Sequence, residues 1–330
     1  MEPEYIGVDL HKQFLQVCAL TATGGRAWET RLPRSPGGLA AFCGRCGPHS
    51  HVAVEATSPT WAFVDAVLPT GARVCVVDTR QTKLKAGYAA KTDRLDARRL
   101  ADALRRDSVV SVYIPPPAIR ELREICRGRH QVVRLRTRVS QMIRALLLRS
   151  GVADLPVRQV YSARGRRWLA TVALPPEAAT TLQRLVRVLD TLHAEATEAE
   201  AVVVARAEGD PIARALDTLV GIGPVLGLTL RAEIGDGTRF RAGAELACYA
   251  GLVPRVDSSG DRYYVGRITR QGSPWVRWAL VEAARHAIRR DDRIGRWARR
   301  LAVRKGGMKA RVALARRLSD EVIAMWPRSA

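Results

Sequence analysis

The chain has 330 residues, 47% of them hydrophobic, and is therefore long enough for two or three domains that each bury a core. Its 54 Lys and Arg residues outnumber its 32 Asp and Glu residues, and the formal net charge of +22 favours a polyanionic partner, because phosphate neutralisation releases counterions. No apolar stretch approaches the roughly 18 residues of a membrane span and the cysteines are too sparse for a disulfide scaffold, so we expect a cytoplasmic protein with reduced thiols and no signal peptide.

Short apolar runs alternate with helical patterns through the first part of the chain and predict a mixed α/β domain of order βββαβαβα. Strands are expected at 5–10, 14–20, 26–32, 51–55 and 73–77, and helices at 36–46, 59–68 and 92–106. Thr92 is the expected N-cap of the last helix, because its hydroxyl can accept a hydrogen bond from the first turn. Cys43 and Cys46 fit a helix end and a polar turn better than a zinc site, because His49 and His51 follow too closely.

Four acidic residues stand where this domain could hold a divalent metal. Asp9 and Glu55 end two predicted strands, and acids that emerge from apolar strands are costly to bury without a cation. Asp93 and Asp96 fall on one face of a predicted helix; taken alone, they would be a capping acid and a solvated charge. Because Mg²⁺ requires oxygen ligands, the four together predict a metal site for phosphodiester chemistry.

After three consecutive prolines at 115–117, the sequence predicts one long helix over 118–150. Apolar residues follow a near-heptad pattern there, and arginines crowd the other faces of the helix. Two interpretations remain open: a coiled coil between chains, or an intramolecular pair with a second predicted helix at 177–207. Turns are expected between them at 165–167 and 175–176.

Gly221 and Gly223 belong to a glycine-containing turn over 219–227, between two helical patterns. The turn looks like a helix-hairpin-helix, in which glycines let backbone N–H groups approach a nucleic-acid phosphate. A tight helix connection would use the same residues, so the basic surroundings give the nucleic-acid interpretation its weight.

A loop is predicted over 251–260, where Ser258 and Ser259 precede Gly260, and a helix follows through Arg285. A serine among arginines could attack a phosphorus held by guanidinium groups. The arginines expected to bind nucleic acid are Arg255, Arg262, Arg267, Arg270 and Arg277. No histidine is nearby in sequence, so activation would come from a metal or a distant acid. By itself Ser-Ser-Gly is typical of a plain turn.

The segment 285–317 holds thirteen basic and two acidic residues. Such a surplus favours contact with a phosphate backbone over a merely solvated helical surface. Trp275, Trp278 and Trp297 could stack on bases, although their helical spacing is more typical of core residues.

Seven motifs together point to one protein family. They are Gly7-Val-Asp9-Leu-His-Lys12, Val54-Glu55-Ala56, Lys91-Thr-Asp93-Arg-Leu-Asp96-Ala97, Gly221-Ile-Gly223-Pro, Gly251-Leu-Val-Pro254, Ser258-Ser-Gly260 and Gly266-Arg-Ile-Thr-Arg-Gln-Gly272. In this order, over nearly the whole chain, they resemble the DEDD transposases of insertion sequences, the family that includes Piv-type DNA invertases and bridge-RNA-guided recombinases. Gln271 departs from a loop that is often more basic.

The resemblance implies a RuvC-like (RNase H fold) α/β domain at 1–112, a helical coiled-coil and oligomerisation region at 113–209, and a mostly α-helical transposase domain at 210–330. This last domain would carry the helix-hairpin-helix and the serine loop. The resemblance also implies that four acids bind Mg²⁺ and that a serine forms a covalent link to DNA. Carried over, the acids are Asp9, Glu55, Asp93 and Asp96, and the serine is Ser259, with Ser258 as the fallback.

The predicted function is that of an insertion-sequence transposase or site-specific recombinase, which cleaves and exchanges DNA strands with metal assistance. The expected partners are DNA, a structured guide RNA and further copies in a dimer or tetramer, in a bacterial cell and at the nucleoid when acting, with no membrane. The main alternative is a RuvC-like junction-resolving nuclease that uses metal-activated water. An actin-like kinase is disfavoured because His11 and Lys12 follow Asp9. A non-catalytic DNA-binding protein would not explain the four acids.

Overall fold

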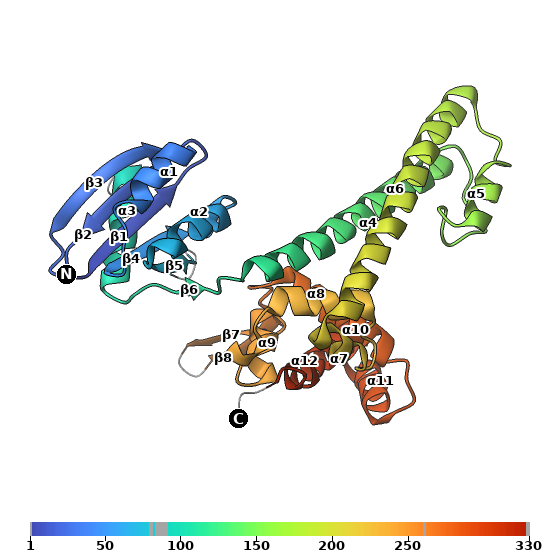
Figure 1. Ribbon diagram of the computed structural model, residues 1–330. Helices are drawn as coiled ribbons and strands as arrows, with labels where there is room; N and C mark the ends of the chain where they lie inside the picture. The colour runs from blue at the N-terminus through green and yellow to red at the C-terminus, as the bar shows by residue number, and fades with distance from the viewer. Residues whose placement is uncertain (1, 79–81, 83–91, 260–261, 328–330) are drawn as a thin grey trace. The chain divides into compact units, whose positions relative to one another are not determined.

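The computed structural model describes residues 2–78, 82, 92–259 and 262–327, with the backbone alone at 257–259, 262–263 and 265. It divides the chain into two compact units, Met1–Ile114 and Pro115–Ala330 (Figure 1). Among the described residues, none of the helices has the length and apolar character that a membrane span requires.

The first unit is built on a six-stranded mixed sheet. Its strands are β1 (Glu4–Leu10), β2 (Phe14–Leu20), β3 (Arg26–Pro33), β4 (Ser50–Glu55), β5 (Arg73–Val77) and β6 (Ser111–Val112), in the spatial order β3-β2-β1-β4-β5-β6. The first three strands form an antiparallel meander, whereas β1, β4 and β5 run parallel to one another. The carboxyl ends of the two central strands, β1 and β4, therefore lie at the same edge of the sheet.

Helices cover both faces of this sheet. They are α1 (Pro36–Cys43), α2 (Thr60–Val67) and α3 (Asp93–Arg105), with a short 3-10 helix at Leu68–Thr70. One face packs Ile6, Val8 and Val54 against Phe42 of α1 and Phe63 of α2. The other face packs against α3 (Figure 1). Because strand side chains alternate between faces, Gly7 and Asp9 of β1 belong to the α3 side.

The predicted order of elements agrees with the structure of this unit, with two differences. The helix at 36–46 ends at Cys43 and is capped by Gly44, because the segment that follows forms turns up to β4. The short strand β6 was not predicted; it pairs antiparallel with the end of β5. Thr92 is the N-cap of α3, as predicted, and its hydroxyl accepts a hydrogen bond from the Leu95 amide.

The second unit is mostly helical. Its helices are α4 (Pro117–Arg149), α5 (Ala163–Leu169), α6 (Pro176–Gly209), α7 (Pro211–Asp217), α8 (Pro224–Ile234), α9 (Gly243–Tyr249), α10 (Pro274–Ala287), α11 (Arg293–Lys305) and α12 (Gly307–Ala324), with a 3-10 turn at Gly237–Arg239. The long helices α4 and α6 pack along each other, and their far ends enclose a core that includes Ile143, Leu147 and Leu189. Helices α4 and α6 therefore form the intramolecular pair, one of the two interpretations left open by the sequence. This pairing does not establish a coiled coil between chains.

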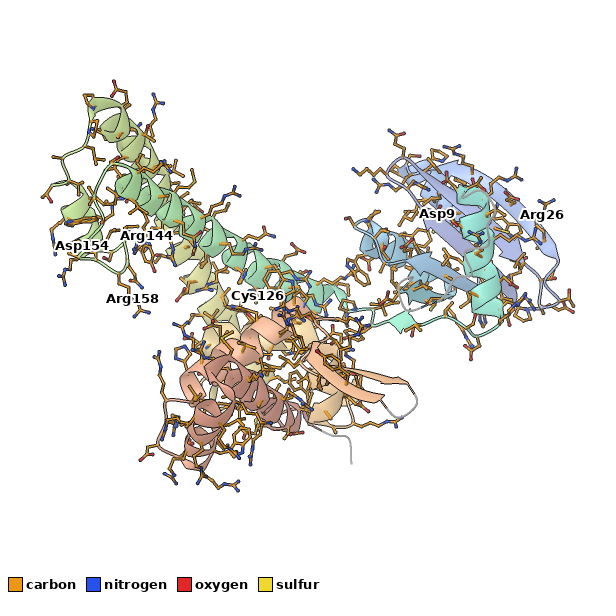
Figure 2. All side chains as sticks on the ribbon, turned by 180° about the vertical axis from the view of Figure 1, so that it is seen from behind. Asp9, Arg26, Cys126, Arg144, Asp154 and Arg158 are labelled. Carbon is orange, nitrogen blue, oxygen red and sulfur yellow. The ribbon has the colours of Figure 1, made fainter. Side chains whose placement is uncertain are left out.

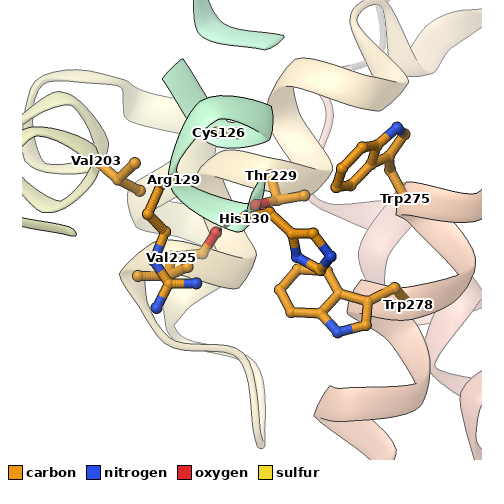
Figure 3. A pocket seen from close by; sticks show the side chains of 8 residues that line it. All are labelled: Cys126, Arg129, His130, Val203, Val225, Thr229, Trp275 and Trp278. Atoms are coloured by element: carbon orange, nitrogen blue, oxygen red, sulfur yellow. Dashed lines mark hydrogen bonds between the residues drawn. The ribbon is translucent and has the colours of Figure 1, made fainter. Parts of the chain in front are cut away.

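The N-terminal half of α4 packs against the C-terminal helices through buried polar contacts. The Arg127 guanidinium donates two hydrogen bonds, of 2.7 and 3.0 Å, to the carboxylate of Glu233 in α8, whose side chain is only 3% exposed. His130 of α4 lies edge-on to the rings of Trp275 and Trp278 in α10, at 4.8 Å from each (Figure 3). Trp278 also packs on the main core of the C-terminal helices, so the core role of this tryptophan is observed.

Two predictions for this unit were wrong. The turn expected at 165–167 lies inside α5, which Ser162 caps by accepting a hydrogen bond from the Gly165 amide. The loop expected over 251–260 is largely strand: β7 (Pro254–Ser259) pairs antiparallel with β8 (Arg262–Ile268). Turn-forming residues such as Asp257 and Ser258 suggested a loop, whereas the β-branched and aromatic residues of β8 supply a partner strand.

Candidate metal centre

The candidate centre begins with the close approach of α3 to β1. A Cβ atom placed on Gly7 would lie 2.0 Å from the carbonyl oxygen of Ala97 and 2.5 Å from the amide nitrogen of Ala101. Only glycine fits there, because any side chain would enter the backbone of the helix. The absence of a side chain at Gly7 lets α3 lie directly on the strand.

This packing brings the Asp93 end of α3 toward Asp9. From Gly7 to Asp9 the strand advances by about 6.6 Å. From Ala97 back to Asp93 the helix covers nearly the same length, about 6 Å. Asp9 therefore stands beside the first turn of α3 (Figure 2). The side chain of Asp9 is 17% exposed and that of Asp93 is 47% exposed.

Glu55 holds the equivalent place on the neighbouring strand. The last paired residues of the parallel strands β1 and β4 are Val8 and Val54, so Asp9 and Glu55 each follow a paired valine. The end of β4 is fixed by the Thr60 hydroxyl, which donates a 2.7 Å hydrogen bond to the Glu55 carbonyl. Adjacent strands lie about 4.8 Å apart, so the two acids are neighbours at one edge of the sheet.

Asp96 lies on the same face of α3 as Leu100, which follows it by one helical turn. Leu100 packs with Ala53 of β4 and Val77 of β5, so this side of α3 lies over the strand that ends in Glu55. The Asp96 carboxylate accepts a 3.2 Å hydrogen bond from Arg99, and both side chains are 26% exposed. The pair restricts the position of the carboxylate without burying it.

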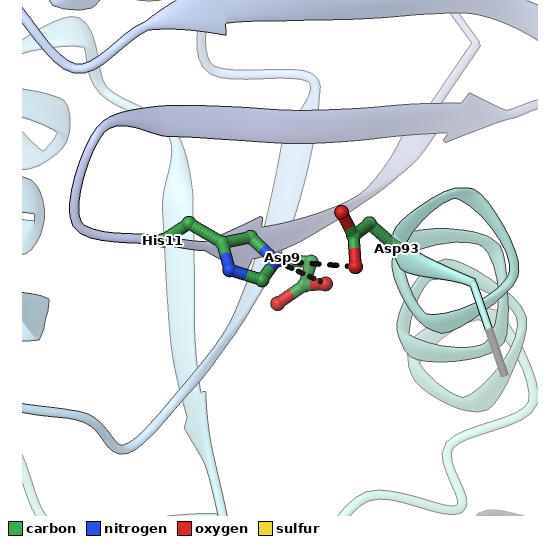
Figure 4. Close-up of side chains that lie close together, drawn as sticks. All are labelled: Asp9, His11 and Asp93. Atoms are coloured by element: carbon green, nitrogen blue, oxygen red, sulfur yellow. Dashed lines mark hydrogen bonds and ion pairs between the residues drawn. The ribbon is translucent and has the colours of Figure 1, made fainter.

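His11 lies between two of the acids, and sequence analysis did not identify it as a site residue. Its Nε2 atom lies 3.0 Å from Oδ2 of Asp9 and 3.5 Å from Oδ1 of Asp93 (Figure 4). Its ring stacks on Phe14 at 4.5 Å. The spacing of residues 9 and 11 is compatible with side chains on the same side of the chain, but the contact of His11 with Asp93 depends on the packing of α3 on β1.

The electrostatics of Asp9 are those of a crowded anion. Burial raises the pKa of the Asp9 carboxyl above its ordinary value, the hydrogen bond from His11 opposes the shift, and the charges of Asp93 and Asp96 raise the pKa further. A cation bound among these carboxylates would relieve the repulsion between them.

The donor atoms fit a divalent cation. One ligand atom each from Asp9, His11 and Asp93 lie within 4.8 Å of one another, the only such group of His, Cys, Asp and Glu side chains in the described part of the chain. Two of these donors are carboxylate oxygens, which hard cations prefer. Cys43 and Cys46 form no comparable group: the Cys43 thiol donates to the Ala66 carbonyl, and both cysteines pack on the core of the first unit.

The predicted serine belongs to the second unit. Ser259 is the last residue of β7, Ser258 precedes it, and both side chains lie outside the described part of the chain, as does that of Arg262. Arg267 and Arg270 are exposed. Arg277 donates a 2.8 Å hydrogen bond to the Ala250 carbonyl, and burial, followed by the charge of Arg270, lowers its pKa.

The two predicted phosphate-binding glycines differ in their surroundings. Gly221 has φ +82°, and a Cβ atom there would lie 2.4 Å from the Ala283 carbonyl oxygen of α10, so close packing explains this glycine. Gly223 is the N-cap of α8 and has open space around it. Of the two, only Gly223 leaves room for a ligand at a helix N-terminus.

A mixed sheet with acids at the carboxyl ends of its two central strands and on the covering helix is compatible with an RNase H-like domain of the DEDD type. Comparison with known families agrees. A DEDD transposase model of the IS110 type, described as "Transposase", matches residues 6–151, and a model described as "Transposase IS116/IS110/IS902 family" matches residues 213–298.

Full-length relatives extend this result. A probable family 20 transposase of Pseudomonas aeruginosa is 30% identical over 94% of this chain and 93% of its own length. The transposase for insertion sequence element IS1111A of Coxiella burnetii is 26% identical over 98% of this chain and 89% of its own. The transposase for insertion sequence element IS1328 of Yersinia enterocolitica is 25% identical over 95% and 94%.

The chain belongs to the IS110 family of DEDD transposases, as the resemblance predicted. It is therefore a transposase of an insertion sequence, an enzyme that acts on DNA, and its family implies the use of a divalent metal.

Proposed function

We propose that this transposase cleaves and exchanges DNA strands through Ser259, with Mg²⁺ held by Asp9, Glu55, Asp93 and Asp96. The proposal is based mainly on one observation: Asp9 and Asp93 both approach His11 at the end of the sheet where β4 terminates in Glu55. When bound, Mg²⁺ would polarise the scissile phosphate and favour proton loss from the nucleophile.

Neighbouring residues of this chain orient the four acids. His11 can donate a hydrogen bond to the Asp9 carboxylate, and the same Nε2 atom lies 3.5 Å from Oδ1 of Asp93, so this ring holds the two carboxylates near each other. Arg99 positions Asp96, and Thr60 fixes the backbone at Glu55. Such a frame reduces the reorganisation needed when DNA arrives, since the charged groups are already held together.

The covalent step balances without an external energy source. The Ser259 Oγ atom forms a bond to the scissile phosphorus, the phosphorus–oxygen bond to one DNA end breaks, and the serine proton passes to the departing oxygen. A hydroxyl of the partner strand then attacks the phosphoserine and releases Ser259. One phosphodiester replaces another. Arg255, Arg267 and Arg270 are proposed to bind phosphates of the DNA near the β7–β8 hairpin that carries Ser259.

The same proposal includes three domains, at 1–112, 113–209 and 210–330, a structured guide RNA and a homo-oligomer. Exposed apolar residues on the long helices support the oligomer: Leu135 is 51% exposed and Met142 is 47% exposed, one heptad apart on α4. The net charge of +22 supports a nucleic-acid partner but does not distinguish RNA from DNA. Sequencing the nucleic acid that copurifies with the protein tests whether a structured guide RNA is bound.

The central experiment compares Ser259→Ala with the adjacent Ser258→Ala on DNA that carries the element and its flanks. We expect Ser259→Ala to abolish recombination and the covalent protein–DNA complex on a denaturing gel, while Ser258→Ala retains both. Undiminished recombination and covalent complex with Ser259→Ala would exclude Ser259.

The alternative, a RuvC-like junction-resolving nuclease that uses metal-activated water, predicts a different result. Its Ser259→Ala variant would cleave branched DNA at the wild-type rate and never form a covalent complex. Asp9→Ala would abolish activity under either mechanism and serves as the common control.

A further inference from the structure

An arginine-lined hollow lies on the first unit, outside the acidic cluster. It has a volume of about 310 Å³ and opens between α3 and the turn that joins β2 to β3. The charged residues that line it are Arg98, Arg99, Asp102, Arg105 and Arg106, four arginines and one aspartate. The hollow is therefore strongly positive within a unit whose sheet edge carries acids.

These residues form one stripe along α3. Counted from Arg98, they stand at i, i+1, i+4, i+7 and i+8, which places them on one side of the helix. Arg99 connects the stripe to the candidate metal centre, because its guanidinium contacts Asp96 at 3.2 Å and also lines the hollow. The hollow and the acids thus follow one another along a single helix.

Part of the stripe is held in place by internal contacts. Asp102 accepts two hydrogen bonds from Arg105, of 2.7 and 3.2 Å, and forms an ion pair with Arg106 at 2.9 Å. Arg105 also donates to the Ala22 carbonyl at 3.4 Å, in the turn that forms the opposite wall. One carboxylate is thus shared by two guanidinium groups, and the positive charge of the hollow is only partly neutralised.

Arg98 is the most telling residue. Its side chain is exposed and makes no ion pair with any acid in the described ranges of the chain. The helix dipole explains arginines in the last turn, such as Arg105, but not one in the middle of α3. An unpaired arginine beside a hollow fits an external anion.

We propose that this hollow binds a phosphate of the DNA strand whose neighbouring bond is cleaved at the acidic cluster. Guanidinium groups match phosphate oxygens in geometry and charge. Asp96 and Asp102 are six residues apart, about 9 Å along the helix axis. The hollow thus lies within a few nucleotides of the candidate metal centre. This inference rests on the proposed function and adds the path of the strand.

The test measures DNA binding without metal, so that it does not depend on chemistry. Full-length protein in EDTA is titrated with a mixed-sequence DNA duplex of about 30 base pairs at salt concentrations from about 50 to 200 mM. The variant is the double substitution Arg98→Ala with Arg106→Ala. The matched control is Arg45→Ala with Arg73→Ala, which removes the same charge from exposed positions of the same unit.

We expect the slope of log K against log salt to fall by one to two in the hollow variant, about one for each phosphate that the protein no longer neutralises. The slope of the control should stay at the wild-type value. Thermal melting of both variants checks that the fold is retained. An unchanged slope in the hollow variant, or an equal fall in the control, overturns the proposal.

Two further arms separate the possible failures. The same titration with RNA of equal length tests the source of the phosphate, and a fall in slope on RNA without a fall on DNA overturns the proposal. Asp9→Ala should bind DNA with the wild-type slope but fail to cleave it with Mg²⁺. If the hollow variant alters binding while Ser259→Ala still recombines, the hollow stands and the serine mechanism fails.

Discussion

The backbone of Gly7 in β1 lies against the carbonyl group of Ala97 in α3, with no space between them for even a methyl group. This contact sets the distance from the sheet to the helix that carries Asp93 and Asp96. The separation of the acids from Asp9 thus depends on a residue that has no side chain.

Gly7→Ala should therefore damage the site from a distance. The added methyl must move α3, and we expect a loss of about 3 kcal/mol or more in the free energy of unfolding, because the clash is with backbone. Metal-dependent cleavage should fall with it. Gly37→Ala, where a Cβ atom meets nothing within 4 Å, is the control. Equal stability of the two variants by chemical denaturation would contradict the expectation.

Asp9→Asn should separate stability from activity. Removing one of three crowded negative charges should stabilise the metal-free protein by about 1 kcal/mol, because an asparagine carbonyl can still accept the hydrogen bond from His11. Strand cleavage should be lost. Calorimetry in EDTA measures the first effect, with Asp154→Asn, at an exposed loop position, as the control for charge. A destabilised Asp9→Asn would show that the acids do not repel one another.

Glu233→Ala should disrupt the second unit, since it leaves the half-buried guanidinium of Arg127 without its carboxylate. We expect a loss of about 3 kcal/mol in the free energy of unfolding. Glu282→Ala removes a partly exposed pair with Arg285 and should cost less than about 1 kcal/mol. Urea denaturation followed by tryptophan fluorescence measures both. Similar costs would mean that the buried pair contributes little.

The cysteines should react in an order that the fold determines. Burial raises the pKa of the Cys126 thiol to about 11 and that of Cys46 to about 12, whereas Cys248 is exposed. Iodoacetamide at about pH 8 should thus label Cys248 in the folded protein and spare Cys126 and Cys46, because the thiolate is the nucleophile. Peptide mass spectrometry reads the result, and urea-unfolded protein should be labelled at every cysteine. Rapid labelling of folded Cys126 would contradict the packing of α4.

Most of the first unit was predictable because its signals are local. Apolar strands that end in Asp9 and Glu55, and a capped helix that begins at Asp93, each follow from a few consecutive residues. The proximity of Glu55 to Asp9 follows once β1 and β4 are known to be parallel, whereas the approach of Asp93 to Asp9 depends on the packing of α3 on β1. His11 was missed because its contact with Asp93 spans two elements, and only the packing of α3 on β1 brings them together.

The second unit was less predictable because its pairings are distant in sequence. The helix lengths could be read from periodicity, but a heptad pattern does not say whether the partner of α4 is α6 or another chain. The serine segment was expected to be a loop, since its polar residues suggested a turn, whereas pairing with β8 makes it a strand. The close packing of Gly221 on α10 could not be read from the sequence, and its contact with a phosphate stays a prediction.

The 33-residue helix α4 has a further consequence. It is about 50 Å long. Its N-terminal half packs on α8 and α10, and its C-terminal end shares a core with α5. A helix held at both ends transmits a displacement of one end to the other. A partner that moved α5 would therefore load the Arg127–Glu233 ion pair with α8 and the contacts of His130 with α10, the helix that follows the serine hairpin β7–β8.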